Sequence, residues 1–168
     1  KQFKKIKLIK NNKKKFTKGP LNQIYGILKA FSISKGNLIC LLDSDDKFEK
    51  KKLNEINNFF KKKPLIDFIV NLPKENSNFF LKRREVDNSN WPSIFPTSCI
   101  SFRRSFFLKF KKKIIPNKYP NLEIDARLII YAYHHSLNKK MTIINKKLTK
   151  YVKSYNSISS NYPKFSIN

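Results

Sequence analysis

A short apolar run over residues 37–42 stops directly at three carboxylates, Asp43, Asp45 and Asp46. The run is too short and too uniformly apolar for a surface helix, so it predicts a buried strand of a largely parallel sheet, covered on both faces. The carboxylates would then lie at the carboxyl end of this strand, where open α/β sheets bind ligands. Clustered carboxylates repel one another unless a proton or a cation relieves them. The pattern therefore predicts a divalent metal site.

Helical and strand patterns alternate on either side of this run. Apolar residues recur at helical spacing between Leu21 and Phe31, and the spacing favours further helices over residues 53–60, 106–110 and 122–133. Further strands are expected over residues 6–9, 65–70, 97–102, 141–145 and 148–152. The alternation predicts an α/β fold with a mixed, mainly parallel sheet flanked by helices. We expect a single domain over residues 1–168, with a loose tail over 157–168.

The formal net charge of +26 raises the question of nucleic-acid binding, since a basic surface collects phosphates by counterion release. Only five of the 37 basic residues are arginines, however, whereas base and phosphate recognition favours the bidentate arginine fork. The lysines are also scattered along the whole chain. We therefore expect no specific nucleic-acid binding. Peripheral contact with anionic lipid headgroups stays open, at about 1 kcal/mol for each basic residue near such a surface.

Other features bear on the compartment. No apolar run approaches the roughly 20 residues that span a bilayer, and the lysine-rich start lacks the apolar core of a signal peptide. Cys40 and Cys99 lack metal-ligand spacing and are expected to be reduced core thiols. These features favour a cytoplasmic protein, peripheral at the inner face of the membrane if it contacts lipid. The chain begins with Lys1 rather than Met, which predicts an internal piece of a longer reading frame.

Several segments in a fixed order carry a family resemblance. Residues 34–46 join a helix end, an apolar strand and the three aspartates, residues 97–104 form a strand ending in two arginines, and residues 122–125 form an acidic motif. In this order they resemble the nucleotide-sugar half of a family 2 glycosyltransferase of the GT-A fold, which is Rossmann-like. The resemblance covers roughly residues 6–159. It implies that the strand and loop that bind the nucleotide base precede Lys1, so that the fold is truncated at its N-terminus.

The closing part of the resemblance departs from the family pattern. Residues 148–159 are similar to the family's closing segment, but Val152 and Ser154 stand where that segment commonly has an arginine and a histidine. No phosphate-contacting role is assigned to this segment.

The resemblance implies a donor site that uses the three aspartates. A nucleoside diphosphate leaves with accumulating negative charge, and hard oxygen ligands suit Mg²⁺ or Mn²⁺ held against the two phosphates. By resemblance Asp45 would be the metal ligand, with Asp46 as a supporting ligand. Asp43 would lie nearer the ribose or share the metal through water. The donor would be a nucleotide-diphosphate sugar.

The resemblance also implies the chemistry of the acceptor. An acceptor hydroxyl is a poor nucleophile until a positioned base takes its proton, a contribution of about 10² to 10⁴ in rate. Asp125 would be this base, with Glu123 as the fallback. The enzyme would be an inverting hexosyltransferase that acts on a glycan or lipid-linked acceptor in glycan or surface polysaccharide synthesis. Contacts to acceptor or phosphate are assigned to Arg103, Arg104 and Trp91.

Simpler explanations are available for the same residues. The aspartates could cap the following helix, since aspartate is a favoured N-cap, and Asp125 in a helix first turn needs no function. Arg103 and Arg104 could be solvated charges at a helix start, and Trp91 could bury a loop. The adjacent pair His134 and His135, near a helix end, is typical of a surface pair rather than a metal site.

Two other functions remain open at this point. A haloacid-dehalogenase-like phosphatase would use Asp43 as nucleophile and Asp45 as acid/base, but Asp46 and Lys47 stand where that family continues with a glycine and a threonine or valine. A non-catalytic basic module would gather basic and aromatic residues on one face for nucleic acid or membrane. Asp45 and Asp125 on one side of the sheet would favour glycosyl transfer over both.

Overall fold

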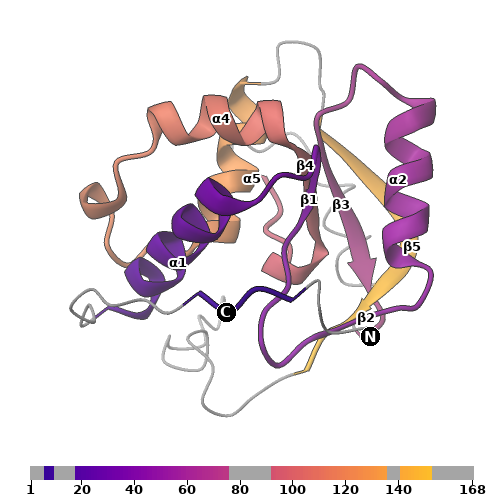
Figure 1. Ribbon diagram of the computed structural model, residues 1–168, viewed down its shortest axis with the longest axis horizontal. Coiled ribbons are helices and arrows are strands. Elements are labelled where there is room, and N and C mark those ends of the chain that lie inside the picture. Colours follow the sequence, from indigo (N-terminus) through magenta and orange to yellow (C-terminus); the bar gives the residue numbers. More distant parts are fainter. Residues whose placement is uncertain (1–5, 10–17, 76–91, 136–140, 153–168) are drawn as a thin grey trace, which may run out of the picture.

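The computed structural model describes residues 6–9, 18–75, 92–135 and 141–152. Within these segments the fold is a mixed α/β layer structure with one sheet between helices (Figure 1). The strands are β1 (Leu38–Cys40), β2 (Lys47–Phe48), β3 (Phe68–Pro73), β4 (Ile100–Arg103) and β5 (Met141–Lys150). The helices are α1 (Gly19–Ile33), α2 (Lys52–Lys62), α4 (Arg104–Lys113) and α5 (Ile124–His135), with short 3₁₀ turns η2 (Thr97–Cys99) and η3 (Pro116–Lys118).

The order of strands in the sheet is β1-β4-β3-β5-β2. The mixed sheet flanked by helices is confirmed, but the expectation of a mainly parallel sheet is wrong for the described pairs. Only β3 and β5 run parallel, whereas β1 with β4, β3 with β4 and β2 with β5 are antiparallel. Helix and strand alternation does not by itself fix strand direction, because a long connection such as the one between β3 and β4 lets the chain return either way.

The strand that precedes the acids is less enclosed than predicted. β1 lies at one end of the described sheet, its three residues are half-buried, and Leu42 just beyond it is 50% exposed. A strand covered on both faces was therefore the wrong expectation. Residues 6–9 are not in a strand either, and both Ile6 and Leu8 are largely exposed. Their apolar alternation has no described partner strand to pack beside.

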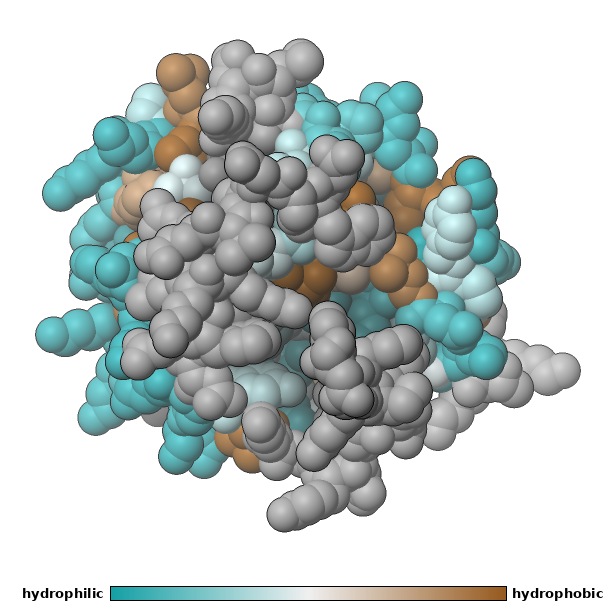
Figure 2. All heavy atoms as spheres, turned by 180° about the vertical axis from the view of Figure 1, so that it is seen from behind, coloured by the Kyte–Doolittle hydropathy of each residue, from teal (hydrophilic) through white to brown (hydrophobic). Residues whose placement is uncertain are grey.

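Alternating side chains of β3 divide the core into two layers. Phe68, Val70 and Leu72 belong to the larger cluster under α1, α4 and α5, whereas Ile69 packs in a second cluster with α2. This is the two-residue period of a strand buried on both faces. Figure 1 shows α2 on the opposite side of the sheet from the other three helices. On the face of the molecule seen in Figure 2, hydrophilic side chains surround smaller hydrophobic patches.

Aromatic contacts fix α1 and α4 against the sheet. The rings of Phe102 and Phe107 are stacked, with their centroids 5.2 Å apart. The ring centroid of Phe107 also lies 4.3 Å from that of Phe31 in α1. Such pairs add about 0.5–1.5 kcal/mol each to the free energy of burial. They hold α1 beside the end of β1, where the acidic turn begins.

Other elements follow the sequence patterns with shifted limits. The helices expected over residues 53–60, 106–110 and 122–133 correspond to α2, α4 and α5. The two closing strands are one continuous strand, β5, whose register against β3 shifts at Leu72 and again at Pro73. Residues 97–99 form η2 rather than the start of a strand. Cys99 is buried and Cys40 half-buried, and both thiols are free, as predicted.

Candidate functional site

The three aspartates lie in a tight turn that follows β1. The backbone N–H of Asp46 donates to the carbonyl of Asp43 at 3.2 Å, and the N–H of Asp43 donates to Ser98 Oγ at 2.8 Å. Gln23 of α1 donates from Nε2 to Asp43 Oδ1 at 3.2 Å. The turn is thus held from two sides, by η2 and by α1, and the Asp43 carboxylate has a fixed orientation.

The carboxylates of the turn differ in their environment. Asp45 is exposed, whereas Asp46 is only 6% exposed. Asp46 Oδ1 accepts the backbone N–H of Val152 at 2.9 Å, and its other oxygen has no hydrogen-bond partner. The N-cap of α2 is Lys51, and no side chain caps that helix. The simple explanation of these aspartates as a helix cap is therefore wrong.

Glu123 and Asp125 stand at the start of α5, as predicted, with Glu123 immediately before the helix and Asp125 in its first turn. Asp125 is 9% exposed and accepts the N–H of Ala126 at Oδ1, 2.6 Å away. Burial, followed by the negative charge of Glu123 and then that of Asp43, raises the pKa of Asp125 to about 7. Burial and the charge of Asp43 likewise raise the pKa of Glu123. The fold therefore brings Asp43 close to the acidic motif of α5.

Four other described acids, Asp45, Asp46, Glu123 and Asp125, lie near Asp43, although the net charge of the chain is +26. Burial is the main cause that raises the pKa of Asp43, the hydrogen bond from Gln23 opposes it, and the charges of Asp46 and Asp45 raise it further. Carboxylates whose pKa values are raised by neighbouring negative charge, here Asp43, Glu123 and Asp125, attract a proton or a cation. The site is thus a region of negative charge on a basic protein.

Two basic side chains are buried in the core, and sequence reasoning did not find them. Of the residues that the structure describes, the buried basic ones are Lys52 and Arg127. Lys52 donates to the Ser98 carbonyl and to Thr149 Oγ1, the latter at 2.9 Å, and its ammonium lies 4.1 Å from the ring centroid of Phe48. Burial lowers the pKa of Lys52 to about 8. Nothing in the sequence distinguishes it from the many exposed lysines.

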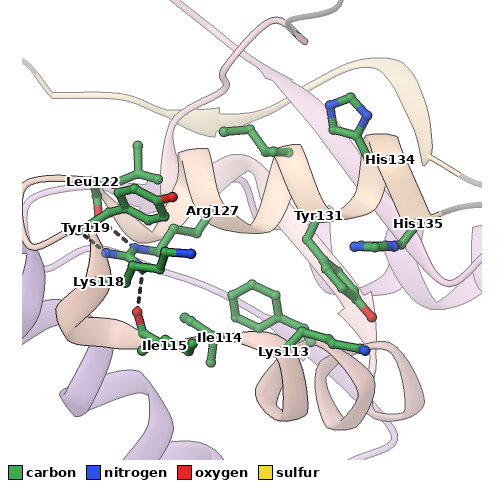
Figure 3. A pocket seen from close by; sticks show the side chains of 12 residues that line it. Lys113, Ile114, Ile115, Lys118, Tyr119, Leu122, Arg127, Tyr131, His134 and His135 are labelled. Atoms are coloured by element: carbon green, nitrogen blue, oxygen red, sulfur yellow. Dashed lines mark hydrogen bonds between the residues drawn. The ribbon is translucent and has the colours of Figure 1, made fainter.

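Two cavities lie beside the helices α1 and α5. One of about 240 Å³ lies between α1 and the end of β1, and Gln23, Leu42, Asp43 and Thr97 are among its lining residues. The other, of about 380 Å³, lies between α4, η3 and α5 (Figure 3). His134 and His135 stand at its rim as exposed side chains at the end of α5, in keeping with the predicted surface pair. Asp43 lines the first cavity, so the smaller one is the closer to the acids.

The remaining predicted contact residues are elsewhere. Arg103 donates to the carbonyls of Ile66 and Phe60, and Arg104 donates to the Gly36 carbonyl and to Ser34 Oγ. Arg103 pairs with Leu38 at the start of β1, whereas the acids follow its end. Both arginines therefore bind backbone carbonyls of neighbouring segments rather than stand as solvated charges, while their contact with acceptor or phosphate stays a prediction. Trp91 lies outside the described residues.

The carboxylates of the acidic turn are of a chemical type that suits a divalent cation. Asp43 and Asp45 offer hard oxygen ligands in one turn, and Mg²⁺ is commonly held by one or two carboxylates together with substrate phosphates. Within the parts of the chain that the structure describes, no three side chains of Asp, Glu, His or Cys form a group that could hold a metal ion. A site of this kind would take its remaining ligands from the diphosphate and from water.

The model of glycosyl transferase family 2 matches residues 1–138. The chain belongs to this family. The match contains the acidic turn and the start of α5, and it ends before β5 and before Val152 and Ser154, where the sequence departs from the family pattern. A comparison with curated proteins gave no match. The phosphatase alternative is wrong, because the family that matches transfers glycosyl groups.

As a family 2 glycosyl transferase domain, the chain acts by glycosyl transfer, and the mixed α/β fold is compatible with a fragment of GT-A type. Among the helices described, none is both long and apolar enough to cross a membrane.

Proposed function

We propose that this family 2 domain transfers a sugar from a nucleotide-diphosphate sugar to an acceptor hydroxyl, with inversion at the anomeric carbon. The observation that carries the proposal is the proximity of Asp43, at the end of β1, to Glu123 and Asp125 at the start of α5. Two groups of acids from distant parts of the sequence thereby form one site, with a donor side and an acceptor side.

Asp125 supplies the base in this proposal. A general base works best with a pKa near the working pH, and the pKa of Asp125 is raised to about 7 by burial and by its acidic neighbours. Its Oδ1 accepts the N–H of Ala126, which holds the carboxylate in place. The acceptor hydroxyl gives its proton to Asp125 as its oxygen attacks the anomeric carbon. Direct displacement by one oxygen inverts that carbon.

The acidic turn forms the donor side. Asp45, which is exposed, and Asp43, which Gln23 orients, would hold a divalent cation. When bound, Mg²⁺ or Mn²⁺ neutralises the charge that develops on the leaving diphosphate. Asp46 is the least suited of the three, since one of its oxygens accepts the Val152 N–H and its side chain is buried. The resemblance made it a supporting ligand, and we now give that role to Asp43.

The acceptor and the setting are assigned from the resemblance alone. We propose a hexose donor and a glycan or lipid-linked acceptor, in synthesis of glycan or surface polysaccharide. Such donors are expected in the cytoplasm, and the excess of lysine suits peripheral contact with anionic lipid.

The test is release of nucleoside diphosphate by the full-length protein from a panel of nucleotide-diphosphate sugars with Mn²⁺ or Mg²⁺. We expect release from at least one donor, loss of it on adding EDTA, and a fall of about 100-fold or more in Asp45→Asn and in Asp125→Asn. Glu55→Gln is the matched control, because it also removes an acid, one that pairs with Lys146 on the surface. Release that survives EDTA contradicts the metal role, and full release by Asp125→Asn contradicts the base. No release from any donor contradicts the proposed transfer.

A further inference from the structure

Arg127 makes an unusual set of contacts for an arginine in this basic chain. It is only 7% exposed, and it donates to four backbone carbonyls of the segment before α5. Nε donates to Leu122 at 2.9 Å, Nη1 to Ile115 at 3.4 Å, and Nη2 to Pro116 at 3.1 Å and to Tyr119. Figure 3 shows the guanidinium enclosed by this segment. All four acceptors are carbonyls, so the contacts hold a loop rather than balance a charge.

The loop held by Arg127 leads directly into the acidic motif. Leu122, one of the four acceptors, immediately precedes Glu123, and Asp125 follows two residues later. The backbone N–H of Arg127 also donates to the carbonyl of Glu123 at 3.1 Å. The guanidinium and the backbone of one residue thus fix both the loop and the first turn of α5.

Arg127 and Asp125, both at the start of α5, direct their side chains to different regions of the molecule. Residues two apart on a helix do not face each other. The side chain of Arg127 therefore lines the 380 Å³ cavity, whereas Asp125 lies near Glu123 and Asp43. The acids depend on the loop for their place, but the arginine that holds the loop does not reach into their site.

We propose that Arg127 is a positioning residue that fixes the start of α5, so that Glu123 and Asp125 lie beside Asp43. It acts through the backbone of residues 115–122 and not by contact with a substrate. The effect on glycosyl transfer rests on the proposed function, but the effect on the loop does not. A planar fork with five N–H donors is suited to several carbonyls at once, which a lysine ammonium is not.

The direct measurement is amide hydrogen exchange in Arg127→Met and Arg127→Lys. The informative amides are those of Lys118 and Leu122, which donate to the carbonyls of Ile115 and Tyr119 within the loop. We expect their exchange to become at least about 10-fold faster in both variants while the amides of β3 keep their protection, since local opening is separable from global unfolding. Lys113→Met is the matched control, because Lys113 lines the same cavity as an exposed cation. Unchanged exchange at Lys118 and Leu122 in Arg127→Met overturns the proposal.

Two further readouts separate positioning from simple loss of stability. In Arg127→Ala, methylguanidinium at non-denaturing concentration should restore protection of the loop amides, and methylammonium should not. The carboxyl carbon of Asp125, followed by NMR, should titrate about one pH unit lower in Arg127→Met, because a loosened turn relieves its burial and its proximity to Glu123. Equal recovery with both additives, or an unshifted Asp125, contradicts the proposal.

Transfer kinetics add a test that distinguishes the two proposals. If Arg127 positions the base, Arg127→Lys lowers kcat by about 10-fold or more with a smaller change in KM. An unchanged kcat in a variant with a mobile loop overturns the positioning role. A wild-type chain that transfers no sugar, yet shows the exchange and titration changes, overturns the proposed function alone.

Discussion

The negative charge of Asp43 raises the pKa of Asp125, although Asp43 follows strand β1 and Asp125 begins helix α5. It acts together with burial, the larger cause, and with the charge of Glu123. A donor-side acid thereby affects the protonation of the proposed base. This relationship links the two groups of acids and, if Asp125 is the base, makes the reaction sensitive to pH.

The first prediction concerns the pH dependence of transfer. If Asp125 is the base, kcat/KM falls below about pH 7, with a slope that approaches one on a logarithmic plot. Glu123→Gln removes a charge that raises the pKa of Asp125, so the same fall should begin at lower pH. The measurement is the initial rate of transfer across the pH range.

Glu55→Gln serves as the control for this profile, because Glu55 lies on the surface of α2 and pairs with Lys146. Its profile should match that of the wild type. If the fall of kcat/KM begins at the same pH in Glu123→Gln as in the wild type, the titrating group is not the buried Asp125.

The second prediction concerns stability. The pKa of Asp125 in the folded state, about 7, is higher than that of an unfolded aspartate, so the folded chain binds this proton more tightly. The stability that results is fully present below about pH 4 and is lost as the pH rises to about 7. Asp125→Asn avoids this loss and should be more stable than the wild type above pH 7, on the order of 4 kcal/mol.

Urea unfolding at acidic and neutral pH measures this difference. The gain should shrink to near zero below about pH 4, where the Asp125 carboxyl becomes protonated in the unfolded chain as well as in the folded one. If Asp125→Asn is less stable than the wild type at neutral pH, the buried, ionised carboxylate of Asp125 does not destabilise the folded chain.

The third prediction concerns the support of the acidic turn. Ser98→Ala removes the acceptor of the Asp43 N–H, and leaving such a buried group unpaired costs about 1–3 kcal/mol. We expect that loss of stability together with slower transfer, since Asp43 then loses its contact with η2 through Ser98. Ser32→Ala, an exposed serine of α1 that donates to Lys29, is the control and should change little. Equal behaviour of the two variants in unfolding would argue against the turn being held by Ser98.

The fourth prediction concerns Lys52, whose folded-state pKa of about 8 is lower than that of an unfolded lysine. Between this pH and the unfolded value the unfolded chain binds more protons, so stability should rise with pH. From about pH 7.5 to about pH 9.5 the expected gain is roughly 2 kcal/mol. Lys52→Met should lack this gain, whereas Lys51→Met, which alters the exposed neighbour, should retain it. If the stability of the two variants, measured by urea unfolding, changes equally with pH, the prediction is refuted.

The helices were the most predictable part of the fold. The spacing of apolar residues located α1, α2, α4 and α5 to within a few residues, because each helix buries one face against the sheet. Strand direction was not predictable, since the same apolar run suits a parallel or an antiparallel neighbour. The edge position of β1 and the exposure of residues 6–9 depend on which strands pair beside them, and sequence periodicity carries no such information.

The sequence by itself determined which acids are candidates for the site, and that one set follows a strand and the other begins a helix. Only the tertiary structure decided that Asp43 lies close to Asp125, that Asp46 is buried while Asp45 is exposed, and that Arg103 and Arg104 stand at the other end of β1. Among the basic residues that the structure describes, it also selected Lys52 and Arg127 as the buried ones. The reason is physical: charge and residue type are local properties, whereas burial and the distance between charges arise from packing of segments far apart in the chain.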